Sequence, residues 1–131
     1  MIVTTDIANI LYKDCKAFGM EVYQSGNIPD EDKELSSERV IIIAKSQSPE
    51  AIWKKGFVEV NLCVPDMDGK ANLIRLQELE RKAQGVLDDV VGKFDGSSYY
   101  YSIDQIGTEA DTALKCHYVN VRLLFQVLNV K

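Results

Sequence analysis

The strongest constraint on the fold is a long run of alternating residues near the end of this 131-residue chain. Within His117–Val130, large apolar side chains occupy every second position along most of the run. Successive side chains of a strand point to opposite faces of its sheet, so the run predicts a long strand with one apolar and one polar face. The apolar positions are Val119, Val121, Leu123, Phe125 and Val127, and the polar positions are Asn120, Arg122 and Gln126.

Four further segments have the composition of strands. Arg39–Ala44 is a β-branched run, and Gly56–Val64 alternates so that Val58, Val60, Leu62 and Val64 share a face. The four predicted strands are Met20–Gln24, Arg39–Ala44, Gly56–Val64 and Tyr99–Ile106. Breaks are expected at Ser46–Glu50, which follows the second of them, and at Gly107–Asp111, a polar turn before the last strand. The charged stretch Asp30–Glu38 predicts an exposed loop.

Two helices are expected from apolar residues spaced three and four apart. The first is capped by Thr4 or Thr5 and ends at Gly19, a residue that suits the left-handed conformation after a helix. Its apolar stripe is Ile7, Ile10, Leu11, Cys15 and Phe18. The second follows the turn Pro65–Gly69 and is predicted over Ala71–Phe94, with a stripe of Leu73, Leu76, Leu79, Ala83, Val86, Leu87, Val90 and Val91.

The predicted order of elements is therefore α, β, β, β, α, β, β. Two amphipathic helices on one face of an antiparallel or mixed sheet of about five strands form an α+β fold. The length and the even composition predict a single domain over residues 1–131.

Composition excludes several classes of function. The net charge is −5 and the Lys and Arg residues are scattered, which argues against a nucleic-acid-binding protein. The N-terminus lacks the pattern of a signal peptide, and no run of about 20 apolar residues is present to cross a bilayer. Three widely spaced cysteines do not suggest a disulfide framework, so we expect a reducing compartment.

No catalytic residue, metal ligand or cofactor-binding residue is predicted. The single histidine, His117, adjoins Cys116, but neighbours on a strand point to opposite faces and cannot pair as a nucleophile and base. The sequence Asp66–Gly69 resembles the start of a calcium loop, yet Gln77 stands where the ligating Glu is required. The glycines occur singly and form no phosphate-binding loop.

Aromatic residues supply the only candidate site. In a strand, Tyr99 and Tyr101 share a face and Tyr100 points the other way, which fits either strand propensity with a core-facing ring or an interface. Trp53 is open to the same two interpretations, core edge or contact surface. The candidate interface residues are Trp53, Tyr99, Tyr100 and Tyr101.

Taken in order, these elements resemble the tail-terminator and tail-completion proteins of long-tailed bacteriophages. The resemblance covers nearly the whole chain and lies in the length, the order of elements and a few turn residues. The segments that carry it are the helix Asp6–Phe18, the strand and turn Glu21–Pro29, the strands Val40–Ala44 and Phe57–Val64, the helix Leu73–Phe94 and the final strand.

The resemblance implies a structural protein and no enzyme. Its copies would form a ring, usually a hexamer, that caps the tail tube and joins it to the head. The implied partners are further copies of the chain and the tail-tube or connector proteins. The implied location is the cytoplasm during assembly and then the virion tail.

Three other interpretations stay open from the residues alone. A head–tail connector or neck protein of a phage or prophage would share the small α+β build. A cellular ligand-binding or regulatory domain would place Tyr100 and Trp53 in a pocket. An enzyme would require a cleft in which a carboxylate lies within hydrogen-bond distance of His117.

Overall fold

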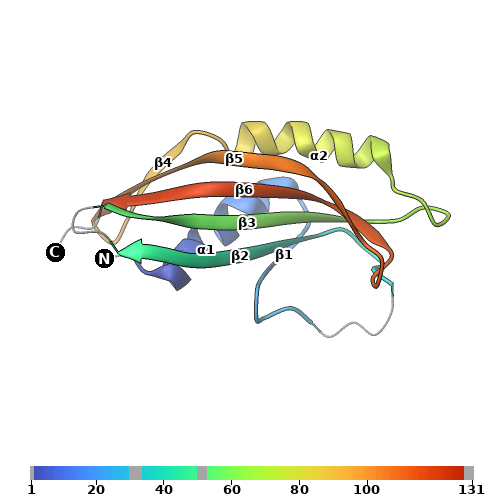
Figure 1. Cartoon of the computed structure of the whole chain (residues 1–131), viewed down its shortest axis with the longest axis horizontal. Coiled ribbons are helices and arrows are strands. Elements are labelled where there is room, and N and C mark those ends of the chain that lie inside the picture. The colour runs from blue at the N-terminus through green and yellow to red at the C-terminus, as the bar shows by residue number, and fades with distance from the viewer. Residues whose placement is uncertain (1, 30–33, 50–52, 129–131) are drawn as a thin grey trace.

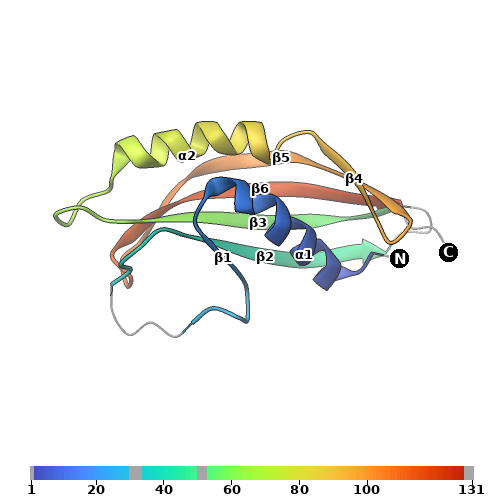
Figure 2. The ribbon, with the colours of Figure 1, turned by 180° about the vertical axis from the view of Figure 1, so that it is seen from behind.

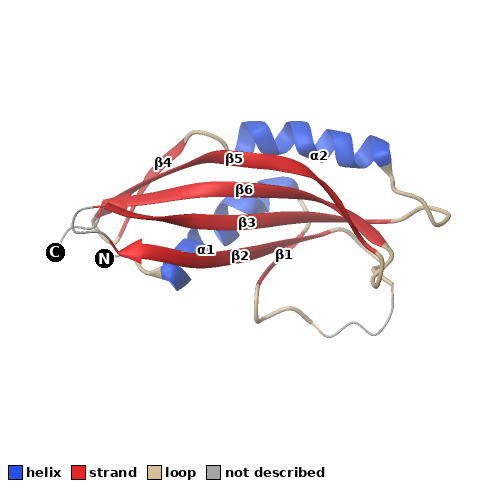
Figure 3. Cartoon of the chain, viewed as in Figure 1, coloured by secondary structure: helices blue, strands red, loops and turns tan. Residues whose placement is uncertain are grey.

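A computed structural model of the chain describes residues 2–29, 34–49 and 53–128. Within these ranges two α-helices, one short 3-10 helix and six strands follow one another, and Figure 3 shows the helices and strands by colour. In chain order they are α1 (Thr4–Asp14), η1 (Cys15–Phe18), β1 (Glu21–Gln24), β2 (Arg39–Pro49), β3 (Trp53–Pro65), α2 (Leu73–Val86), β4 (Val90–Phe94), β5 (Ser97–Asp111) and β6 (Cys116–Leu128).

The six strands form one mixed sheet in the order β1-β2-β3-β6-β5-β4. Among the strand pairs of the described ranges, β1–β2 is parallel and the other four are antiparallel. The two central strands, β3 and β6, pair along their whole lengths, from Trp53 opposite Leu128 to Pro65 opposite Cys116. The α+β class and the mixed sheet are therefore confirmed, with one strand more than the five expected.

Both helices lie on the same face of the sheet. In Figure 1 the sheet is seen from its other side with no helix in front of it. Figure 2, the view from behind, shows α1 lying across the sheet in front of the strands. One apolar cluster joins the buried sides of α1 and α2 to alternate residues of β3 and β6. The apolar positions of each alternating central strand thus form the side of that strand that lies under the helices. The strand residues of this core include Val58, Val60, Leu62, Val119, Val121, Leu123, Phe125 and Val127.

The second helix is much shorter than predicted. It ends at Val86, and residues 90–94 form the strand β4 instead of two further helical turns. Leu87 caps the helix with a non-helical backbone, Asp89 takes a left-handed backbone (φ 58°) that a helix cannot contain, and the β-branched pair Val90–Val91 favours a strand. The Asp95–Gly96 turn has positive φ at both residues, the conformation of a tight hairpin turn, and it joins β4 to β5.

Three other boundaries also differ. The segment Gly107–Asp111 belongs to β5, because it pairs with β6 throughout, and the turn falls at residues 112–115. Strand β2 runs on to Pro49 past an irregularity between Ala44 and Gln47, where a break was expected. The cap of α1 is Val3, whose backbone N–H donates to the Asp6 carboxylate, and not Thr4 or Thr5.

The stretch predicted as an exposed loop is only partly so. Residues 30–33 lie outside the described structure, and Glu34, Ser36 and Ser37 are exposed. Leu35 is buried, and its N–H donates to the carbonyl of Leu114 (2.8 Å). This segment therefore packs onto the sheet at the end where β5 turns into β6.

Candidate interaction surface

The face of the sheet opposite the helices carries no helix and is open to a partner. Its side chains come from the alternate positions of β2, β3, β5 and β6 that point away from the core, and most are half-buried by their neighbours. We call this the open face. Its residues include Ile41, Ile43, Phe57, Glu59, Asn61, Tyr100, Asn120, Arg122, Leu124 and Gln126.

A polar network fixes the middle of the open face. Asn120 donates through Nδ2 to Asn61 Oδ1 (2.7 Å) and Glu59 Oε1 (3.1 Å), and Lys45 Nζ lies 3.1 Å from Glu59 Oε2. Partial burial acts to raise the pKa of Glu59, but the hydrogen bonds from Asn120 and Lys45 outweigh it and hold the pKa below its ordinary value. The carboxylate therefore stays ionised and holds its neighbours in place.

Beside this network lies an apolar and cationic patch. The guanidinium of Arg122 stacks over the Phe57 ring, 3.7 Å from its centroid, and Leu124 is the cross-strand partner of Phe57. Arg122 also lies 3.7 Å from the Asp104 carboxylate. Aromatic, arginine and large aliphatic groups held rigid on a surface are the usual composition of interface centres.

One end of the open face is covered. Leu35 packs there on Cys63 and Cys116, with Ile41, Leu114 and Tyr118 around them. The chain beyond Leu35 is held by Glu38, which accepts hydrogen bonds from Arg75 Nε (2.7 Å) and Nη2 (3.0 Å) of α2. Burial raises the pKa of the Cys63 thiol to about 12, so this sulfur is not a nucleophile at neutral pH.

The tyrosines of β5 divide between the two faces as the alternation predicted. Tyr99 and Tyr101 lie under the helices, where each stacks on Phe125 at 5.4 and 5.5 Å between ring centroids. Tyr101 is fully buried and donates its hydroxyl to Asp14 (2.7 Å), so it is a core residue with no surface left for a partner. The Tyr99 ring covers Gly92, where a Cβ would lie 2.4 Å from the Tyr99 hydroxyl.

Tyr100 is the tyrosine that remains on the open face. Its hydroxyl donates to Asp89, and its ring borders a shallow groove of about 400 Å³. Val91, 74% exposed, lines the same groove with Lys93 and Ser98. The side chain of Trp53, the fourth predicted interface residue, lies outside the described part of the structure.

The sequence did not single out the other residues of this surface. Phe57 and Leu124 point to the side of their strands on which polar residues predominate. Val91 falls within the helix that the sequence predicts over Ala71–Phe94. An apolar residue in the polar register of an alternating strand is the signal that could have identified Leu124. No comparable signal marked Val91, because its strand was not recognised.

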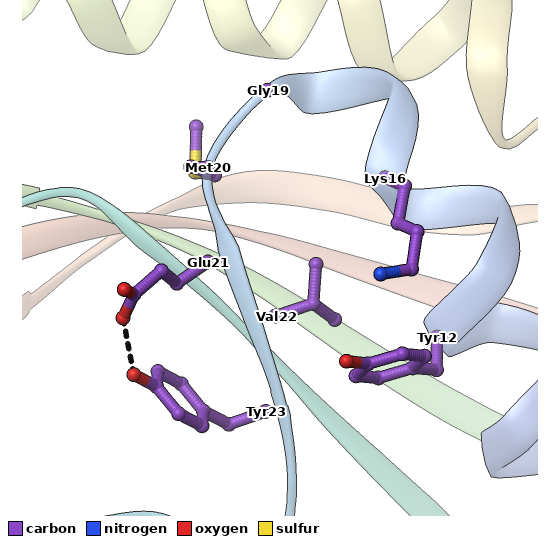
Figure 4. A pocket seen from close by; sticks show the side chains of 7 residues that line it. All are labelled: Tyr12, Lys16, Gly19, Met20, Glu21, Val22 and Tyr23. Carbon is purple, nitrogen blue, oxygen red and sulfur yellow. Dashed lines mark hydrogen bonds between the residues drawn. The ribbon is translucent and has the colours of Figure 1, made fainter.

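A second hollow lies between α1 and β1, at one margin of the sheet. A cavity of about 570 Å³ is lined by Tyr12, Lys16 and Gly19–Tyr23 (Figure 4). The Lys16 amine lies over the Tyr12 ring, 4.6 Å from its centroid. The Glu21 carboxylate accepts a hydrogen bond from the Tyr23 hydroxyl. A smaller cavity of about 410 Å³ continues past Tyr12 towards Asn9 and Asn27.

His117 has a carboxylate partner but no nucleophile beside it. Its Nδ1 lies 2.7 Å from Asp66 Oδ1 at the end of β3. Cys116 faces the other side of the sheet, in the cluster under Leu35, as the alternation predicted. None of the cavities described above is lined by His117, and the described residues contain no group of three or more His, Cys, Asp or Glu side chains that could hold a metal ion.

Neither helix of the described ranges is long and apolar enough to cross a membrane.

Comparisons with known proteins bear on the fold alone. No family model matches the chain, and no curated protein matches it. A solved structure whose name states no function is similar over 100% of this chain and 99% of its own, with a TM-score of 0.62 and 11% sequence identity. The mixed sheet with two helices on one face is thus an arrangement that another protein of nearly the same extent also adopts.

Proposed function

We propose that this protein is a structural subunit of a phage or prophage tail, which assembles into a ring of the tail-terminator type. The observation that supports this proposal best is that the sheet has two different margins along which no described strand pairs. One is β5 beyond Tyr101, where β4 no longer pairs with it, and the other is the short outer strand β1. Two unlike surfaces on one subunit are what a head-to-tail ring requires.

The order of elements that resembles tail-terminator proteins supports the same proposal. The structure adds an open face with a rigid patch around Phe57 and Arg122, which suits contact with a protein partner better than chemistry on a small substrate. In this role the protein would act by its geometry and would not turn over a substrate.

The first test is the solution mass of the purified protein by light scattering over a concentration series. A discrete species near six times the 14.7 kDa chain mass, seen as rings by electron microscopy, is the expected result. Protein that stays monomeric at every concentration up to about 1 mM overturns self-assembly into a ring, since productive oligomer contacts are normally tighter than this.

A second experiment addresses the tail itself. Polymerising tail-tube protein should stop elongating, at a length set by the time of addition, when this protein is added. A head–tail connector or neck protein, the alternative within the same class, would instead bind head particles and leave tube elongation unchanged.

A further inference from the structure

One margin of the sheet ends in an acidic, unpaired strand segment. Strand β4 pairs with β5 only from Ser97 to Tyr101, and no described strand pairs with the outer side of the ten residues that follow. The Asp88 carboxylate accepts the N–H of Ile103 (2.9 Å), so the backbone of Ile103 faces away from β6. This hydrogen bond occupies the outer edge of β5 just past the end of its pairing with β4. The pairing of β5 with β6 is irregular between Ile103 and Gln105.

Beyond the irregularity the edge is regular. Ile103 pairs with Leu123 of β6. Ile106, Thr108 and Ala110 pair in turn with Val121, Val119 and His117, which are the next alternate residues of β6. Antiparallel pairs alternate between bonded and non-bonded types, so the N–H and C=O groups of these three residues also point away from β6. Such a row is a template for another strand.

The opposite margin offers a strand with room beside it. The N–H of Ser25, the residue after β1, donates to the carbonyl of Ile42 (2.8 Å) and so points towards β2. Backbone groups alternate along a strand, so the N–H groups of Val22 and Gln24 point outward. The cavity of Figure 4 lies along this outer edge, bordered by Tyr12 of α1 and Lys16 of η1.

The two margins are complementary in size. On β5 the side chains that share the helix side of the sheet are small at Thr108 and Ala110, which suits the space beside Tyr12 and Lys16.

We infer that the free edge of β5 in one copy adds as a further strand to the outer edge of β1 in the next copy, beneath α1. This contact rests on the proposed ring and specifies its subunit interface. It is a strand addition between two copies of the chain, with main-chain hydrogen bonds supplying affinity and the cavity beside Tyr12 supplying selectivity. Each copy uses its two margins once, so the sheet continues from subunit to subunit.

The test uses proline substitutions that remove one outward N–H each. Gln24→Pro should weaken association at the β1 margin, and Thr108→Pro should weaken it at the β5 margin, each by at least about tenfold in Kd. Gln24→Ala and Thr108→Ala keep the N–H and serve as matched controls, with Kd expected within about threefold of the wild type. Circular dichroism checks that each variant folds, since edge strands tolerate proline.

Mixing the two proline variants provides the sharpest outcome. Each retains one intact margin, so an equimolar mixture should form a dimer that cannot extend, while each variant alone stays monomeric. Concentration-dependent amide shifts in NMR spectra of the wild-type protein should fall on residues 22–24 and 106–110, a measurement that needs no variant.

The outcomes separate this contact from the ring itself. A wild-type ring that both proline variants still form, with shifts on other residues, overturns the strand contact and leaves the ring standing. Loss of association with Gln24→Pro alone indicates that two β1 edges pair with each other and overturns the contact with β5. A wild-type protein without any association overturns both proposals.

Discussion

The two faces of the sheet are built from the same strands and differ in nearly every other respect. Under the helices, Leu123 and Phe125 are fully buried in one continuous apolar cluster. One residue away on the same strand, Arg122 and Leu124 lie half-buried on the open face beside charged and amide groups. The covered face therefore provides most of the apolar burial that stabilises the fold.

The contrast shows how one strand can serve two purposes. A side chain on the covered face cannot be changed without leaving a cavity, whereas one on the open face contributes mainly through its immediate neighbours. The open face is itself unequal, because Leu35 covers one end and nothing among the described residues covers the end near Phe57 and Tyr100. We expect substitutions to separate these three environments.

The largest effect is expected at Phe125. Its ring stacks with Tyr99 and Tyr101 in the core, so Phe125→Ala should lower the free energy of unfolding by about 3–5 kcal/mol. The matched control is Leu124→Ala on the open face, with an expected loss of about 1 kcal/mol or less. Urea unfolding measures both, and equal losses would mean that the two faces do not differ as described.

Leu35 tests the covered end of the open face. Leu35→Ala should cost about 2 kcal/mol and, more specifically, should speed the labelling of Cys63 and Cys116 by a thiol reagent. Cys15 lies in the core on the other side of the sheet, so its labelling serves as the internal control. Uniform labelling rates at all three cysteines, in both proteins, would contradict the covering role of Leu35.

The Tyr101 hydroxyl probes a polar contact within the covered face. Tyr101→Phe leaves Asp14 without its donor and should cost about 1–2 kcal/mol at neutral pH. Burial, and then the bond to Asp14, raises the pKa of Tyr101 above its ordinary value. Its contribution is therefore complete below the unfolded-state pKa of about 10 and declines at higher pH, where the unfolded chain alone releases the proton.

Unfolding measured between pH 9 and 11 checks this sign. The wild-type protein should lose stability faster than Tyr101→Phe as the pH rises through 10. Tyr100→Phe, on the open face, is the control, and its neutral-pH effect should stay within about 0.5 kcal/mol. Parallel pH profiles for wild type and Tyr101→Phe would contradict the assignment.

The smallest effect is expected for the ion pair that anchors the segment leading to β2. Arg75→Ala removes both bonds to Glu38, and because the pair is about one-third exposed the loss should be about 0.5–1 kcal/mol. Hydrogen exchange of the Leu35 amide, which bonds to Leu114, should become faster. A double-mutant cycle with Glu38→Gln isolates the pair, and a coupling energy near zero would show that Leu35 alone holds the segment.

The fold could be predicted wherever the pattern of apolar residues had a single period. Alternation identified β3 and β6 and the side of each that faces the helices, and Gly19, with φ of 73°, ends the first helical segment as expected. The failure came at residues 90–94, where Val90 and Val91 also fit the helical spacing of the preceding stripe. The Asp95–Gly96 pair was a hairpin signal in the sequence, and it was outweighed by that spacing.

Less of the candidate surface could be predicted. The alternation correctly divided Tyr99 and Tyr101 from Tyr100, but it does not state which face the helices cover, so it could not assign Tyr101 to the core. The bond between Tyr101 and Asp14 joins residues 87 positions apart, and the contact of Arg75 with Glu38 spans 37. Contacts of this kind follow from the folded arrangement and leave no local mark in the sequence.

The pairing of β3 with β6 has a consequence for synthesis in the cell. Trp53 pairs with Leu128, so the centre of the sheet is closed by a strand made long after its partner. Contacts this distant in sequence carry a high entropic cost of loop closure and fold slowly. While the ribosome is still making α2, β4 and β5, strand β3 waits with one edge unsatisfied, and the nascent chain is expected to depend on chaperones until β6 emerges.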